Sequence, residues 1–432
     1  MNIPTNVTFI LQTLEAAGYE AFIVGGCVRD IIRGVVPKDW DIATSATPAQ
    51  AKPLFKRTID TGIKHGTITV LIDKQHYEVT TYRIDGEYLD SRRPETVQFT
   101  GSIEDDLARR DFTMNAIAYN PARGFVDPFG GRGDIARKII RCVGEPAHRF
   151  KEDALRVLRA VRFAGTTGFA ICSETLNAVA KLAPNLQNIS PERVREELGK
   201  LVTSPNPGAV ELLYTTGLMP YIIHDHNGRP QAAPTNTTPG RGRDTSPTPV
   251  GANCVRPDVN PSLFTWLHSC PTHEPMRMAL FLHDTGPNCE NILRTLRFDN
   301  NSIKEITLYV KNLHAPLPQT RYEIKKLLRN IPQELFMNLL TLQAIIDPAK
   351  TDALKNIRIE TADIIQKHEC YTLRDLAVNG DMLAQAGIPR GKVMGDILES
   401  LLDTVMCNPE MNTADILMRQ TAILTSTSQT NS

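Results

Sequence analysis

The spacing of hydrophobic and polar positions changes near residue 150, and this change predicts two kinds of structure in the chain. Up to roughly residue 141, short β-branched and aromatic runs alternate with turns, as in the segments 67–72 and 77–83. Beyond residue 150, apolar residues recur at helical spacing in the segments 152–165, 190–202 and 290–298. The pattern therefore predicts an α+β protein, in which a mixed β-sheet with packed helices precedes an all-α remainder.

A segment from about residue 225 to 262 interrupts the helical pattern. It is rich in Pro, Thr, Asn, Gly and Arg, and this composition predicts a disordered insertion rather than a domain. The segment is basic enough for a loose contact with RNA, although a tolerated loop is the preferred interpretation.

Bulk composition adds few constraints. The chain has 48 basic and 48 acidic residues, so its net charge does not indicate a nucleic-acid partner. No run of about 18 apolar residues is present, which argues against a membrane span, and the N-terminal segment lacks the features of a signal peptide. The eight cysteines contain no C-x-x-C pair, so reduced thiols in the cytoplasm are expected rather than a zinc site.

The first candidate for chemistry is a glycine turn. A short apolar strand at 22–24 leads into Gly25 and Gly26, and a helical stretch carrying Arg29 comes next. Glycines allow backbone N–H groups to approach an anion closely, and a helix N-terminus behind them favours a phosphate. Arg29 would add a charge-assisted hydrogen bond. A lone glycine pair more often marks an ordinary strand-to-helix turn, so the prediction depends on the residues that lie beyond the turn.

Two carboxylates lie beyond the glycine turn. Asp39 and Asp41 flank Trp40 in a segment predicted to be a strand, where alternate side chains point to the same face. Such a pair suits a divalent metal ion that holds nucleotide phosphates. Glu78, in a later strand, is a candidate third carboxylate, with an exposed structural position as an equal alternative. Together with the glycine turn, the pair predicts a site for nucleotidyl transfer that uses Mg²⁺.

A third candidate lies in the segment LARRDFTMNAIAYN, which contains Arg109, Arg110, Asp111 and Asn115. Arginine donates to phosphate oxygens in a fork, and an aspartate accepts from both ribose hydroxyls. The alternative is a surface ion pair before a buried strand, and the context favours nucleotide binding.

A fourth candidate is the predicted helix EDALRVLRAVRF. Asp153 and Arg156 are three residues apart on one face, with Arg159 a further turn along. A solvated charged face is the usual meaning of this pattern. An Asp–Arg edge nevertheless matches the amino donor and ring-nitrogen acceptor of cytosine and adenine, whereas uracil and guanine present the reverse order. The pair would therefore accept CTP and ATP and reject UTP and GTP.

These motifs and their order resemble the class II tRNA nucleotidyltransferases, the bacterial CCA-adding enzymes. The similar blocks include GGCVRD, DWDIATSATP, GIKHGTITV, RRDFTMNAIA, DPFGG, EDALRVLRAVRF and PERVREEL. They are dense over the first 200 or so residues and weaker in the helical remainder.

The resemblance implies four parts: a catalytic head at 1–140, a neck for base recognition at 141–205, a helical body at 206–315 and a tRNA-binding tail at 316–432. It implies Mg²⁺ at Asp39 and Asp41, tRNA 3′ ends as the partner, and ATP and CTP as substrates. The nucleotide-binding residues that it implies are Gly25, Gly26, Arg29, Arg110, Asp111, Asp153, Arg156, Arg159 and Arg162.

The resemblance leaves alternative activities open. The loop-like segment at 85–94 favours either complete CCA addition or addition of A alone, and poly(A) polymerases share the same head. A hydrolase is a further alternative, because His283 and Asp284 match part of the HD phosphohydrolase motif. Pro287 replaces the lysine expected after that motif, so a structural remnant is the preferred interpretation.

Overall fold

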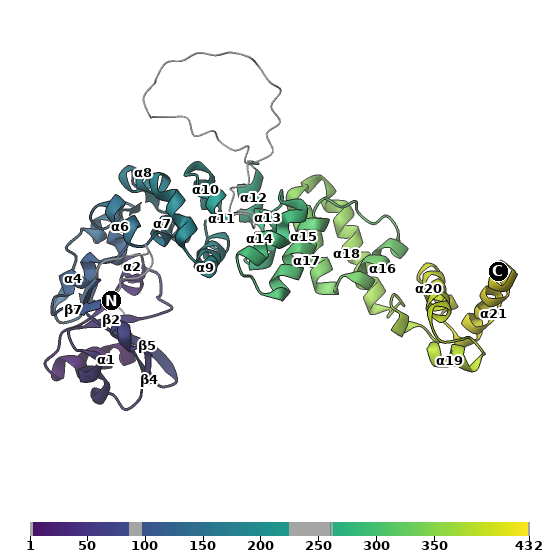
Figure 1. The fold of residues 1–432 in the computed structure, drawn as a ribbon, viewed down its shortest axis with the longest axis horizontal. Helices are drawn as coiled ribbons and strands as arrows, with labels where there is room; N and C mark the ends of the chain where they lie inside the picture. The colour runs from purple at the N-terminus through teal and green to yellow at the C-terminus, as the bar shows by residue number, and fades with distance from the viewer. Residues whose placement is uncertain (1–2, 86–96, 224–259, 261, 431–432) are drawn as a thin grey trace, which may run out of the picture. The chain divides into compact units, whose positions relative to one another are not determined.

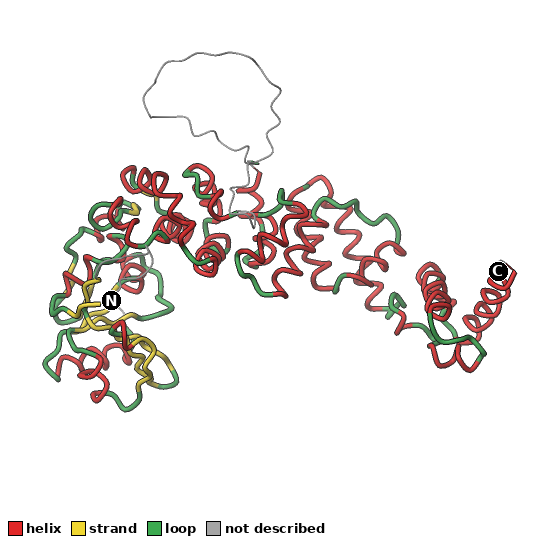
Figure 2. Tube along the Cα trace, viewed as in Figure 1, coloured by secondary structure: helices red, strands yellow, loops and turns green. Residues whose placement is uncertain are grey.

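The computed structural model describes residues 3–85, 97–223, 260 and 262–430, and these fold into a β-sheet region followed by helices (Figures 1 and 2). This arrangement confirms the predicted α+β class. The predicted loop at 85–94 and the predicted insertion at about 225–262 lie almost wholly outside the described residues. The chain divides into two compact units, the first formed by residues 1–268, 272–281 and 290–300, the second by residues 269–271, 282–289 and 301–432.

The first unit contains a seven-stranded mixed sheet with the strand order β3-β4-β5-β2-β1-β8-β9. Its strands are β1 (Ala21–Val24), β2 (Asp41–Thr44), β3 (Thr58–Gly62), β4 (Thr67–Ile72), β5 (Gln75–Thr81), β8 (Ala118–Asn120) and β9 (Gly124–Val126). The β2–β5 pair is parallel, and the other neighbouring strands are antiparallel. In the parallel pair, Asp41 stands opposite Glu78.

Two smaller sheets accompany the main one. Strands β6 (Arg83–Asp85) and β7 (Val97–Phe99) form an antiparallel ribbon, and β10 (Ile139–Ile140) pairs in parallel with β11 (Ala170–Ile171). Strand β11 is the exception to the helical pattern among the described residues beyond 150. It follows Gly168, whose positive φ of 72° ends the preceding helix.

Helices of the first unit pack by the apolar spacing that their sequences show. In α1 the buried residues are Val7, Ile10, Leu11 and Leu14, the i, i+3, i+4, i+7 pattern of a helix with one buried face. The helices that lie wholly or mostly in this unit are α1 (Thr5–Ala16), α2 (Gly26–Ile32), α3 (Pro48–Ala51), α4 (Ile103–Ala108), α5 (Gly131–Ala136), α6 (Pro146–Glu152), α7 (Leu155–Thr167), α8 (Ser173–Leu182), α9 (Pro191–Val202), α10 (Glu211–Thr215), α11 (Met219–Ile222), α12 (Ser262–Ser269), α13 (Glu274–Phe281) and α14 (Cys289–Thr295).

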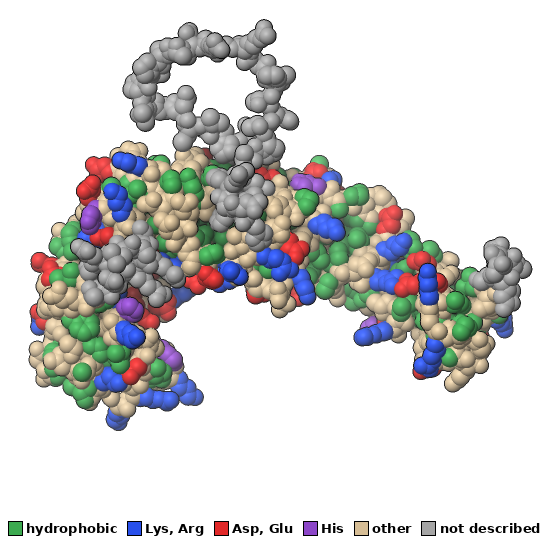
Figure 3. Space-filling view, viewed as in Figure 1, with side chains coloured by type: hydrophobic (Ala, Val, Ile, Leu, Met, Phe, Trp, Pro, Cys, Tyr) green, Lys and Arg blue, Asp and Glu red, His purple; other side chains and the backbone are tan. Residues whose placement is uncertain are grey.

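Among its described residues, the regular secondary structure of the second unit is helical. Its helices are α15 (Asn300–Asn312), α16 (Arg321–Asn330), α17 (Gln333–Ile346), α18 (Thr351–Gln366), α19 (Gly380–Gln385), α20 (Lys392–Cys407) and α21 (Ala414–Thr430). In the described part of the chain, no helix combines the length and the apolar character needed to cross a membrane. On the face drawn in Figure 3, basic and acidic side chains lie interspersed over the helices, in keeping with the balanced charge.

A buried lysine holds the second unit together. Lys325 is fully buried, and its Nζ donates to the Met406 carbonyl oxygen at 3.0 Å and pairs with Glu369 at 2.7 Å. Arg321, one turn earlier on α16, binds the same carboxylate. Lys325 therefore ties α16 both to the segment after α18 and to the C-terminal end of α20.

We expect Lys325→Ala to destabilise the second unit by about 3 kcal/mol, because the substitution opens a cavity and leaves the Met406 carbonyl without its buried donor. Hydrogen-exchange protection of the α16 amides measures this change. Lys367→Ala is the matched control, since Lys367 is exposed and pairs with Asp363 at the surface. Equal protection in the two variants would contradict the assigned role of Lys325.

Candidate active site

The glycine turn lies between β1 and α2, and Gly25 occupies it for two physical reasons. Its φ of 74° is a conformation that L side chains rarely adopt. A Cβ at this position would also stand 2.7 Å from the Arg110 guanidinium and 3.8 Å from the Asp41 carboxylate. The turn therefore brings Gly25, Asp41 and Arg110 together from three separate segments of the chain.

The two aspartates lie at the start of β2, but only Asp41 belongs to the strand. Asp39 lies in a bend before it, so the predicted strand alternation does not apply to Asp39. Pro37 lies two residues before Asp39 and has no backbone N–H that could donate to a neighbouring strand. Asp39 nevertheless remains close enough for its charge to act on both Asp41 and Glu78.

The electrostatics of this corner favour a cation. Burial, which removes water from the carboxylate, raises the pKa of Asp41; the Arg110 charge opposes this rise, and the Asp39 carboxylate adds to it. Burial likewise raises the pKa of Glu78, and the negative charges of Asp41 and Asp39 raise it further. A bound cation would relieve this repulsion between carboxylates.

The donor set fits a hard divalent ion that shares its coordination with phosphate. Within the described residues, no three His, Cys, Asp or Glu side chains form a metal-binding group of their own. Glu78 therefore does not complete a three-ligand cluster with Asp39 and Asp41, and His283 and Asp284 belong to no such cluster. Two carboxylates that leave the remaining positions to phosphate and water are typical of Mg²⁺ sites.

Arg110 is held in place by a buried carboxylate, Asp106. Its Nη2 donates to Asp106 at 3.1 Å, while Arg109 binds the same carboxylate at 2.9 Å. The Nε atom of Arg110 is buried and has no hydrogen-bond partner among the described residues. Asp106, which the sequence interpretation missed, is 1% exposed, and both arginines lower its pKa against the effect of burial. Its spacing of three and four residues from the two arginines was the available signal.

Asp111 is the centre of a buried polar network. Its Oδ1 accepts from the Phe112 amide at 2.8 Å and from Asn115 at 3.0 Å, and its Oδ2 accepts twice from Arg159, at 2.9 and 2.6 Å. Burial alone would raise the pKa of Asp111, but Arg159 and these hydrogen bonds outweigh burial and lower the pKa to about 2. The predicted ribose-binding carboxylate is thus already hydrogen-bonded within the protein.

The network extends from Asp111 in two directions. Toward α2, Asn115 accepts from Arg29 at 2.9 Å, and Arg29 also forms two hydrogen bonds with Asp30, at 2.9 and 3.0 Å. Arg29 is 8% exposed, so much of its guanidinium serves contacts inside the protein. The contact to Asn115 joins helix α2 to η3 (Thr113–Asn115), the 3-10 turn just after Asp111.

Toward α9, the network passes through Glu197. This carboxylate accepts from Arg159 at 3.4 Å and from Arg162 at 2.7 Å. The Arg162 guanidinium also stacks on the Phe163 ring, 3.6 Å from its centroid. Sequence interpretation assigned both arginines to nucleotide binding but missed Glu197. Helical spacing shows which residues share one face of a helix, but it does not show which other helix packs against that face.

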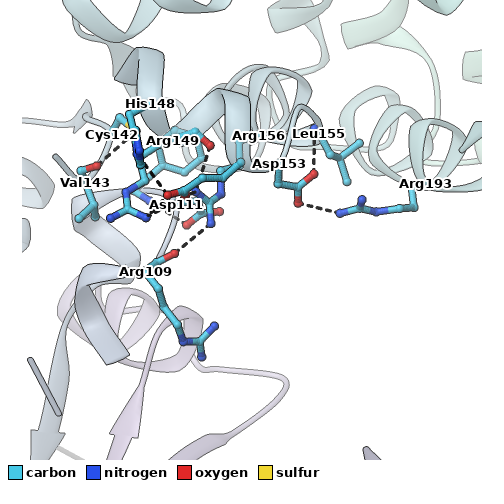
Figure 4. Close-up of polar contacts among 12 residues, drawn as sticks. Arg109, Asp111, Cys142, Val143, His148, Arg149, Asp153, Leu155, Arg156 and Arg193 are labelled. Carbon is cyan, nitrogen blue, oxygen red and sulfur yellow. Dashed lines mark hydrogen bonds and ion pairs between the residues drawn. The ribbon is translucent and has the colours of Figure 1, made fainter. Parts of the chain in front are cut away.

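The two side chains of the predicted base-reading pair, Asp153 and Arg156, bind different partners in the structure. Asp153 lies outside the helices in an extended conformation with φ of −134°, and its Oδ1 accepts from the Leu155 amide at 3.1 Å. The helix predicted over 152–165 is therefore interrupted, because aspartate caps a new helix better than it continues an old one. Figure 4 shows Asp153 directed toward Arg193, at 2.8 Å, and Arg156 directed toward the Arg109 carbonyl, at 2.9 Å. Arg193 is a further residue that sequence interpretation missed.

Comparisons with known proteins find similar sequences along most of the chain. Family profiles match in three places: the poly A polymerase head domain at 21–141, the RNA- and SrmB-binding site of polymerase A at 168–228, and tRNA nucleotidyltransferase domain 2 at 271–420. The CCA-adding enzyme of Geobacillus stearothermophilus is 51% identical over 214 residues, which is 49% of this chain and 53% of that enzyme, so the alignment spans about half of the relative. The CCA-adding enzyme of Lactiplantibacillus plantarum is 36% identical over 416 residues, which is 95% of this chain and 93% of that enzyme.

Solved structures give the same result at the level of the fold. The crystal structure of the Bacillus stearothermophilus CCA-adding enzyme in complex with CTP matches with a TM-score of 0.78 and 31% identity, over 100% of both chains. The Thermotoga maritima CCA-adding enzyme complexed with tRNA matches with a TM-score of 0.63 at 18% identity, over 98% of this chain and 96% of that one. The second likeness is evidence for the fold alone.

The low pKa of Asp111 predicts an acid-sensitive contribution to stability. Because the pKa falls from 3.8 to about 2 on folding, the unfolded chain binds this proton first as the pH drops. The contribution, about 2 kcal/mol, should be fully present above the unfolded pKa and lost as the pH falls through the folded pKa. We expect the difference in free energy of unfolding between wild type and Asp111→Asn to shrink over that window. A difference that stayed constant with pH would refute the assignment.

Proposed function

Because the chain belongs to the CCA-adding enzyme family, we propose that it adds C, C and A to the 3′ end of tRNA from CTP and ATP, with release of pyrophosphate. The observation that carries the proposal is the meeting of Gly25, Asp41 and Arg110 at one corner of the sheet. A glycine turn with a helix behind it, a carboxylate and an arginine are the groups that a triphosphate and its metal ion require.

Nucleotidyltransferases of this family use divalent metal ions, and we propose Mg²⁺ for this chain. Asp39 and Asp41 would hold it. When bound, the metal would lower the pKa of the attacking 3′-hydroxyl and neutralise charge on the leaving pyrophosphate. The Gly25 and Gly26 amides and Arg110 would orient the triphosphate. Catalysis would then rest on positioning and electrostatics, without a covalent intermediate.

Base choice would lie with Asp153 and Arg156. Each side chain is held by the protein, Asp153 by Arg193 and Arg156 by Glu152 and two backbone carbonyls. Groups that are already ordered lose little entropy when they meet a base, and they cannot turn to suit the reverse hydrogen-bond order of uracil. We place two further predicted nucleotide contacts, Arg159 and Arg162, in support of this end of the site. A tRNA substrate would place the activity in the cytoplasm.

Incorporation of labelled CTP and ATP into tRNA transcripts that end before CCA, or after CC, tests the proposal directly. We expect C, C and A to enter the first transcript in that order. Extension of only the CC-ended transcript, and only by ATP, would identify an A-adding enzyme instead, and unlimited A addition would identify a poly(A) polymerase.

Asp39→Ala and Asp41→Ala should each lower incorporation by about a thousandfold or more, because the metal loses one of the two carboxylates that hold it to the protein. The same transcripts and labelled nucleotides measure the loss. Asp60→Ala is the matched control, since Asp60 is exposed on β3 and pairs with Lys52 at the surface. Substantial activity in Asp41→Ala would refute the metal assignment.

Asp153→Ala should relax base choice before it stops the chemistry. We expect the preference for CTP over UTP to fall by about tenfold or more, because the acceptor that matches the cytosine amino group is lost. Single-nucleotide incorporation with all four nucleoside triphosphates measures this ratio. An unchanged ratio would remove Asp153 from base recognition.

A further inference from the structure

One arginine at the end of α2 is bonded to the far end of α7. Arg33 is the residue at which α2 ends, and its Nη1 pairs with Asp30 at 3.3 Å. Its Nη2 donates to the carbonyl oxygen of Thr167, the last residue of α7, at 3.3 Å. Its guanidinium also lies over the Phe169 ring, 5.2 Å from the centroid. Arg33 thus satisfies one of the carbonyl groups that the end of a helix leaves open, with a charge that suits this end of the helix dipole.

A second contact joins the same two helices one turn away. Arg29, four residues before Arg33, has its guanidinium 5.3 Å from the centroid of the Phe163 ring, four residues before Thr167. Helices α2 and α7 are therefore in contact at two points, which lie one turn apart on each helix. Asp30 lies between the two arginines and binds both. One contact would fix only the distance between the two helices, whereas two contacts along each helix also fix their relative direction.

The two helices serve opposite ends of the proposed nucleotide site. Helix α2 begins at the glycine turn, and α7 begins just after Asp153. The distance from the triphosphate to the base is limited by the nucleotide itself, so both groups can be engaged only if α2 and α7 keep one relative placement. A misplacement of about 1 Å can cost about a hundredfold in rate.

We propose that Arg33 is a positioning residue for nucleotide selection, which sets the placement of the glycine turn relative to the base-reading end of α7. The proposal rests on the proposed function. At 1.5 Å per residue, Thr167 lies about 20 Å along the helix from Asp153, so Arg33 does not touch the base. Any effect of Arg33 on base choice must therefore pass through the orientation of α7.

The test compares Arg33→Ala and Arg33→Lys with wild type in single-nucleotide incorporation with CTP, ATP, UTP and GTP. We expect Arg33→Ala to lower kcat/KM for CTP by about tenfold and to reduce the preference for CTP over UTP by a similar factor. KM for the tRNA transcript should not change. Arg33→Lys should be intermediate, because lysine keeps the charge but cannot bind Asp30 and the Thr167 carbonyl together in a fork.

Arg123→Ala is the matched control. Arg123 also combines an ion pair, with Glu20, and a stacking contact, 5.9 Å from the centroid of the Phe22 ring, but it lies at the β8–β9 turn. Its loss should leave base preference unchanged. The ratio between nucleotides does not depend on the fraction of enzyme that is folded, so it separates positioning from stability.

A fall in kcat/KM that is equal for all four nucleotides, or no change, would overturn the proposal. The ratio is measured on whichever transcript the wild type extends. A wild type that fails to add C, C and A would therefore refute the proposed function and still leave the Arg33 result readable.

Discussion

A buried carboxylate has to be compensated, and this requirement at Asp111 organises the first unit. An unpaired charge in a protein interior costs several kcal/mol, so Asp111 needs donors from every side. It obtains them from its own turn, through the Phe112 amide and Asn115, and from α7, through Arg159. The sheet region and the following helices are thus joined by charge as well as by apolar packing. Glu197 repeats the arrangement on α9, where it receives both Arg159 and Arg162.

The same requirement sorts the arginines of the site into two groups. Arg29, Arg156 and Arg159 spend much of their hydrogen-bonding capacity on the protein, and their contacts hold loops and helices in place. Arg110 keeps a buried Nε without a partner among the described residues, beside Gly25 and Asp41. Residue type alone therefore does not show which arginines are fully engaged by the protein. The partners of each guanidinium make the distinction.

Local pattern predicted more of the fold than of the site. The segment 67–72 coincides with β4, and the helical spacing beyond residue 150 was confirmed, because such periodicity follows directly from which face is buried. The glycine turn and Asp41 were predicted because their chemistry needs residues that are close in sequence. Arg193 and Glu197 could not be predicted, since their roles depend on α9 packing beside α7. The interruption at Asp153 was missed because the capping preference of aspartate competed with a strong helical pattern on both sides.

The contacts across residue 140 have a consequence for how this chain can diverge. Arg159 reaches back to Asp111, Arg156 to the Arg109 carbonyl, and the Thr113 amide donates to the carbonyl of Arg141. A recombination event that exchanged only the sheet region with a distant relative would separate these partners and leave charges buried alone. The chain of partners that begins at Asp111 continues through Arg159 on α7 to Glu197 on α9. The sheet region, α7 and α9 would therefore be inherited together, as one module.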